Sequence, residues 1–277
     1  MIIRHLPQAG PALRISALTN RIFMSFALFG LAVLGLPLAA RATPTVTIKL
    51  RGVPIAVNPA QVNSPTYPGT GNILGAGIAA EAEAKISGSE YGGFPPPIIG
   101  VTFLVPAGIR LHPQGFTACP EAVLESHEVA RCPKKSFVSS IGSVSGVVSF
   151  GATRVHETLT LQAFFAPNGE FAFFAEGRSP SLIEVLGKFR VTSGEDGFGP
   201  KFSADVPLVE TVPEAPYGVV EAVKITVGAA FMRASKLISY VTLPKKCPRG
   251  GFTAHFELKF LIGEPATVAA KMPCPTK

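Results

Sequence analysis

The sequence predicts an all-β protein, an antiparallel β-sandwich of about ten strands with one short helix and two disulfides. Three observations lead to this prediction. Apolar and polar residues alternate with a period of two over much of the chain after residue 42, which is typical of half-buried strands. The 28 Gly and 26 Pro residues are spread between these segments, where they favour turns. The four cysteines form an even set, as disulfide-bonded proteins require.

The first 42 residues have the layout of an export signal. Three arginines precede an uncharged apolar run at residues 22–40, and Ala40-Arg41-Ala42 supplies a small-x-small cleavage site. This pattern predicts a signal peptide over residues 1–42 and a secreted mature chain over residues 43–277. A retained membrane anchor is the alternative, because the run is just long enough to span a bilayer. We expect no membrane span after cleavage, since no second apolar stretch is as long.

The mature chain is expected to fold as a single β-sandwich domain over residues 43–277. Two β subdomains, split near residues 178–200, are the alternative. Removing residues 1–42 takes away four arginines and no acidic residue, which lowers the net charge from +7 to +3. A charge of this size gives no argument for nucleic-acid binding. The sequence does not indicate an oligomeric state.

The first half of the chain contains four predicted strands and the predicted helix. Residues Thr45–Leu50 alternate clearly. Residues Ala79–Ile86 contain helix-favouring Ala and Glu, but a strand would place all their charges on one face, so a strand is predicted. The helix is expected from Glu121 to about His127, because Pro120 and Glu121 suit a helix start. The other two predicted strands are Ile98–Val105 and Val144–Phe150.

The second half is predicted to contain a hairpin and further strands. Asn168-Gly169 separates the apolar segments Leu159–Phe165 and Phe171–Phe174, and both residues accept a positive φ easily. A β-hairpin is therefore predicted around this dipeptide. The remaining predicted strands are Val219–Val227, Lys236–Leu243, Phe252–Phe260 and Ala266–Met272.

The cysteines are expected to form two disulfides. An even number of cysteines in an exported chain favours disulfide bonding. We favour the pairs Cys119–Cys132 and Cys247–Cys274, because the members of each pair are close in sequence, although the other two pairings stay open. No CxxC, HxH or HExxH motif is present, so no metal site is predicted. No cofactor is predicted either.

Basic residues flank one cysteine of each pair. If they converge at one edge of the sheet, they form a candidate anion-binding site for an anionic cell-envelope polymer or a surface protein. Solvated side chains that only keep the protein in solution are the alternative. The residues are Arg131, Lys134 and Lys135 around Cys132, and Lys245, Lys246 and Arg249 around Cys247.

Motifs for catalysis are weak in this chain. The segment that comes nearest to the Gly-x-Ser-x-Gly motif of serine hydrolases is Gly142–Gly146, and it has Val144 at the nucleophile position. We therefore expect a secreted, non-enzymatic protein that binds the cell envelope or has a structural role there. The alternative is a secreted hydrolase with an unrecognised Glu/His site, since His255 and Glu257 share one face of a predicted strand.

Three segments resemble an uncharacterised group of secreted proteins from actinobacteria. They are Leu111–Phe116 with Cys119-Pro120 behind it, Val209–Pro213, and Pro244–Phe252. The resemblance covers roughly residues 75 to 275. It implies export and a β-rich fold, and it supplies neither an activity nor a catalytic residue.

Overall fold

The computed structural model describes residues 43–53, 55–56, 66–67, 77–194 and 197–274. The predicted signal peptide, residues 1–42, lies outside the described residues. Among the described residues, no helix combines the length and the apolar character needed to cross a membrane.

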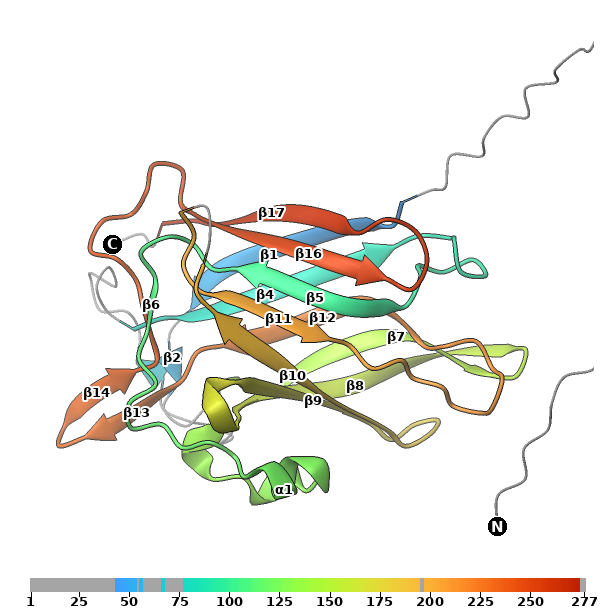
Figure 1. Cartoon of the computed structure of the whole chain (residues 1–277), viewed down its shortest axis with the longest axis horizontal. Helices are drawn as coiled ribbons and strands as arrows, with labels where there is room; N and C mark the ends of the chain where they lie inside the picture. The colour runs from blue at the N-terminus through green and yellow to red at the C-terminus, as the bar shows by residue number, and fades with distance from the viewer. Residues whose placement is uncertain (1–42, 54, 57–65, 68–76, 195–196, 275–277) are drawn as a thin grey trace, which may run out of the picture. The chain divides into compact units, whose positions relative to one another are not determined.

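One antiparallel sheet of eleven strands makes up most of the fold (Figure 1). Its spatial order is β1-β4-β12-β7-β8-β9-β10-β11-β5-β16-β17, and every neighbouring pair is antiparallel. The strands are β1 (Thr45–Val53), β4 (Ala79–Ser87), β5 (Ile98–Leu104), β7 (Gly142–Phe150), β8 (Thr153–Phe165), β9 (Phe171–Gly177), β10 (Ile183–Thr192), β11 (Lys201–Asp205), β12 (Val219–Val227), β16 (Phe252–Phe260) and β17 (Ala266–Met272).

The sheet curls until its two outermost strands, β1 and β17, lie side by side (Figure 1). Opposite parts of the sheet therefore pack through their inner faces, as the two layers of a sandwich do. Ile98 of β5 and Val220 of β12, whose strands are six places apart in this order, lie in one such buried cluster. The predicted all-β antiparallel fold is confirmed.

Most predicted strands are confirmed, and two strands of the large sheet were not predicted. The strand β4 is confirmed although its composition favours a helix, because alternation places Ala84 and Ile86 in the core. The strands β10 and β11 are the additions. The strand β10 crosses the segment where a domain boundary was considered and pairs with both β9 and β11.

The hairpin between β8 and β9 is confirmed. Its turn is the short 3-10 helix η3 (Pro167–Gly169), and Asn168 and Gly169 have φ values of 62° and 76°. This left-handed conformation costs more free energy for residues with larger or branched side chains. The Asn-Gly pair therefore indicated the hairpin turn correctly.

Three two-stranded sheets accompany the large one among the described residues. The prediction of a single strand over Lys236–Leu243 is wrong, because two short strands separate at Tyr240, whose side chain is buried in an aromatic cluster. The pairs are β2 (Ile55–Ala56) with β3 (Thr66–Tyr67), β6 (Arg110–Leu111) with β15 (Val241–Thr242), and β13 (Ala230–Arg233) with β14 (Lys236–Ser239).

The predicted helix is present but shorter than expected. The helix α1 spans Glu121–Glu125 and is followed by two 3-10 turns, η1 (Val129–Arg131) and η2 (Lys134–Ser136). His127 has a φ of 58°, so the helical conformation ends before it. Leu124 is fully buried against Phe164 and Phe174. These two residues lie on the outer face of β8 and β9, which α1 covers.

Candidate functional site

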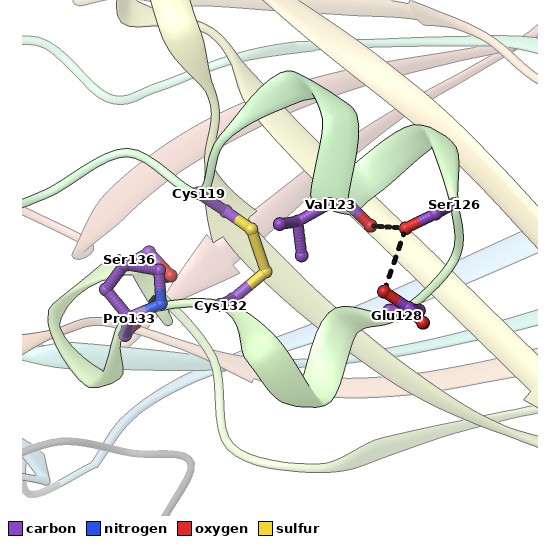
Figure 2. Close-up of a disulfide and its surroundings, with 7 residues drawn as sticks. All are labelled: Cys119, Val123, Ser126, Glu128, Cys132, Pro133 and Ser136. Carbon is purple, nitrogen blue, oxygen red and sulfur yellow. Dashed lines mark hydrogen bonds between the residues drawn. A yellow bond between two sulfur atoms is a disulfide. The ribbon is translucent and has the colours of Figure 1, made fainter.

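The segment from Cys119 to Ser136, which we call the cap, is closed by the first disulfide (Figure 2). Cys119 and Cys132 are bonded across 13 positions, with a Cα–Cα distance of 5.0 Å. Inside the loop, the Ser126 hydroxyl donates to the carbonyl of Val123 at 3.1 Å (Figure 2). The second disulfide joins Cys247 and Cys274. Both predicted pairings are confirmed.

The cap is also tied to β10 by charged side chains. Lys188 forms an ion pair with Glu121, and this hydrogen bond raises the pKa of the Lys188 ammonium group above its ordinary value. The His127 ring lies 2.8 Å from a carboxylate oxygen of Glu184. The cap is therefore an integral part of the fold.

The first basic cluster lies on the cap, and two of its three cations have partners within the protein. Arg131 forms an ion pair with Glu128, the residue that precedes η1. The Lys135 ammonium group lies 4.5 Å from the centre of the Phe231 ring, a distance suited to a cation–π interaction. Lys134, the third cation of this cluster, is exposed and has neither kind of contact with the described residues.

The second basic cluster lies on the loop between β15 and β16, which we call the basic loop (residues 244–251). Lys245, Lys246 and Arg249 are all exposed. Across the described ranges of the chain, none of them has an ion-pair partner. The Cys247–Cys274 disulfide holds the loop against the segment after β17, and the Gly251 amide donates to the carbonyl of Pro248 at 3.0 Å. The three cations are therefore presented on a cross-linked turn.

The two basic clusters lie at different places in Figure 1. The cap is below the sheet, around α1, whereas the loop that leads into β16 is at the upper left. Among the described residues, no backbone hydrogen bond or ion pair joins the two clusters. We therefore consider the basic loop as a candidate site on its own.

His255 and Glu257, the basis of the hydrolase alternative, share the outer face of β16. The His255 ring lies 4.6 Å from that of Phe198, and a Glu257 oxygen lies 3.8 Å from the ammonium group of Lys259. Neither residue lines the groove described next. Among the described residues, no three His, Cys, Asp or Glu side chains are grouped so that they could hold a metal ion.

A groove of about 410 Å³, which sequence reasoning missed, lies beside the N-terminal end of β8. Three segments line it: the turn that carries Tyr91, the start of β8 with Arg154, and the β11–β12 loop with Glu210, Glu214 and Tyr217. About sixty residues separate Tyr91 from Arg154, and a similar number separates Arg154 from Tyr217, so no local motif could reveal the groove.

Hydrogen bonds hold the walls of the groove in place. The Tyr217 amide donates to the Tyr91 hydroxyl at 3.0 Å and so links two of the three segments. Within the β11–β12 loop, the Glu214 amide donates to a carboxylate oxygen of Glu210 at 2.7 Å. This bond supports the positive φ of 64° at Glu214, a conformation that costs free energy for a residue other than glycine.

Aromatic rings position Arg154 in the groove. The guanidinium carbon lies 5.5 Å from the centre of the Tyr91 ring and 5.4 Å from that of Phe94. No carboxylate among the described residues lies within ion-pair distance of Arg154, and its Nη1 atom is buried without a hydrogen-bond partner. Arginine has five N–H donors, so a ring-held guanidinium keeps donors available for another group.

One buried carboxyl group lies on the inner face of β8. Glu157 is 4% exposed, and neither of its carboxylate oxygens has a hydrogen-bond partner in the described structure. Burial raises the pKa of Glu157 above its ordinary value of 4.5, and the nearby backbone of Ser179 offsets this only in part. Glu157 lies against Gly177, where a Cβ atom would approach its Oε1 to 2.5 Å. The group is enclosed by the sheet and lies outside the groove lining.

Comparisons of the chain with models of protein families, with curated proteins and with solved structures found no match.

Proposed function

We propose that this chain is an exported, non-enzymatic β-rich protein that binds the anionic polymers of the cell envelope through the basic loop. The observation that carries the proposal is the exposure of Lys245, Lys246 and Arg249 on a turn closed by a disulfide. Because these cations lack internal partners in the described structure, their full charge is available to an external polyanion. The two disulfides and the layout of residues 1–42 support export.

Rigidity also supports this role for the basic loop. A flexible loop loses conformational freedom when it binds, and this loss offsets part of the interaction free energy. The Cys247–Cys274 bond removes much of that freedom before any partner arrives. The cap does not offer the same surface, since Arg131 and Lys135 already interact with Glu128 and Phe231.

Cosedimentation with isolated bacterial envelopes tests the proposal. The protein from residue 43 onward is incubated with envelopes at low and at high salt, and the pelleted fraction is measured. We expect pelleting at low salt and release at high salt, because salt screens interactions between exposed charges. Protein that stays in the supernatant at both salt concentrations contradicts the proposal.

A charge-matched pair of variants locates the contact. The triple variant K245A/K246A/R249A is expected to lower the affinity for envelopes about 100-fold, at about 1 kcal/mol per cation near an anionic surface. The control K49A/K85A/K236A removes the same charge from other exposed positions and is expected to change affinity much less. Equal losses in the two variants would show that only net charge matters and would remove the basic loop from the proposal.

A further inference from the structure

We propose that the groove lined by Tyr91, Arg154, Glu210, Glu214 and Tyr217 binds a neutral saccharide. This inference rests on a different surface from the basic loop and does not depend on envelope binding. The groove volume of about 410 Å³ falls in the range of small-molecule sites.

The charges in the groove favour a neutral, hydrogen-bonding ligand. Arg154 supplies donors, whereas Glu210 and Glu214 supply carboxylate acceptors. Two carboxylates beside one guanidinium disfavour a purely anionic ligand, and the guanidinium, held by two rings, offsets part of the attraction that the carboxylates exert on a cation. A sugar hydroxyl both donates and accepts, so a polyhydroxyl ligand satisfies both kinds of group at once.

The aromatic residues supply the apolar part of the site. Tyr91 and Tyr217 are both half-buried on the groove wall. Tyrosine combines an apolar ring with a polar tip, which suits a ligand that has C–H faces and hydroxyl edges, as a sugar ring does. The hydrogen bond between the Tyr217 amide and the Tyr91 hydroxyl fixes the two residues relative to each other before a ligand arrives. Preorganisation of this kind favours binding.

The backbone around the groove argues against an extended peptide as the ligand. Peptides that bind by strand addition need free backbone donors and acceptors. Here the amides of Glu214, Ala215, Tyr217 and Gly218 all donate to acceptors within the protein. Recognition is therefore left to side chains, which fits a saccharide better than a peptide strand.

Calorimetric titration with defined oligosaccharides tests the proposal. The neutral probes are maltotetraose, cellotetraose and chitotetraose, and the comparison probes are a galacturonic acid tetramer and a tetraglycine peptide. We expect saturable binding of at least one neutral tetrasaccharide and weaker binding of both comparison probes. If no neutral probe binds at about 10 mM, or if a comparison probe binds more tightly, the proposal is overturned.

Variants then place the ligand in the groove. Tyr217→Ala and Glu214→Gln are each expected to weaken saccharide binding about tenfold, whereas Tyr217→Phe keeps the ring and most of the affinity. Thermal unfolding of each variant shows whether it is folded. K245A/K246A/R249A should bind the saccharide as the unaltered protein does. A failure of saccharide binding can therefore be distinguished from a failure of envelope binding. Undiminished binding by folded Tyr217→Ala would place the ligand elsewhere and overturn the proposal.

Discussion

The cap and the basic loop begin from the same sequence pattern, a Cys-Pro pair with three nearby cations, yet they end in different environments. Cys119 and Cys132 are 0% and 6% exposed and pack with Leu124, whereas Cys247 and Cys274 are only half-buried. Two of the three cations of the cap interact with the protein, whereas all three of the basic loop face solvent without an ion-pair partner among the described residues. Burial around the cysteines therefore decides whether such a segment stabilises the fold or presents charge.

The largest expected effect comes from removing the disulfides. Chain entropy alone predicts that the 27-residue closure stabilises slightly more than the 13-residue one, about 3.5 against about 3 kcal/mol. The buried cap disulfide also contributes packing, so C119A/C132A is expected to cost about 5 kcal/mol and C247A/C274A about 3.5 kcal/mol. Chemical denaturation of both double variants measures the two losses.

The relative size of the two losses in unfolding free energy shows whether burial or loop length dominates. A larger loss for C247A/C274A would mean that loop length outweighs burial, and the distinction between cap and basic loop would fail as an account of stability. Circular dichroism at native conditions is the control, because each variant must retain its β-rich signal before the free energies are compared.

Two carboxyl groups show a similar contrast, because one has a charged partner and the other is buried without one. Glu83 is hydrogen-bonded to Lys224, whose bond and charge lower the pKa of Glu83, so its stabilising effect is present above about pH 4.5 and is lost as pH falls. Glu157 is buried without a partner and has a raised pKa. The folded state therefore holds the Glu157 proton more tightly than the unfolded chain, and stability falls as pH rises from 4.5 through the raised folded-state pKa.

The variant Glu157→Gln tests this difference. At pH 7 it is expected to raise the free energy of unfolding by about 1 to 2 kcal/mol, because an amide avoids the cost of a buried, unpartnered charge. At pH 4 the native carboxyl group is largely protonated, so the same substitution should change stability little. Thermal unfolding across this pH range provides the measurement, and a gain of equal size at both pH values would contradict the explanation.

The fold was predictable where one residue or one alternation fixed the local conformation. Asn168-Gly169 marked the β8–β9 hairpin because both residues take a positive φ. The strand β10 was missed although Ile183, Val185 and Val191 alternate on one face. Gly187 interrupts this apolar face, and only the structure shows that the Phe173 ring occupies the space where its side chain would lie.

The candidate sites were predictable only in part, for a related reason. The cysteine pairs could be inferred because each pair is close in sequence. The groove could not, since Tyr91, Arg154 and Tyr217 come from three distant segments that the curled sheet brings together. Nor could sequence tell which lysines are free: Lys135 lies over Phe231, a residue almost one hundred positions away, on β13.

The smallest expected effect comes from removing cations from the cap and from the basic loop, and it tests directly whether the two segments differ. The variant R131A/K135A removes an ion pair and a cation–π contact and is expected to lower the free energy of unfolding by about 1 kcal/mol. K245A/K246A/R249A removes more charge but no described contact, so its stability should stay within about 0.5 kcal/mol of the unaltered protein. Urea denaturation of both variants in the same buffer compares them. If the basic-loop variant lost as much stability as the cap variant, its cations would have partners in the folded protein. The proposal that they are available to an external polyanion would then have to be abandoned.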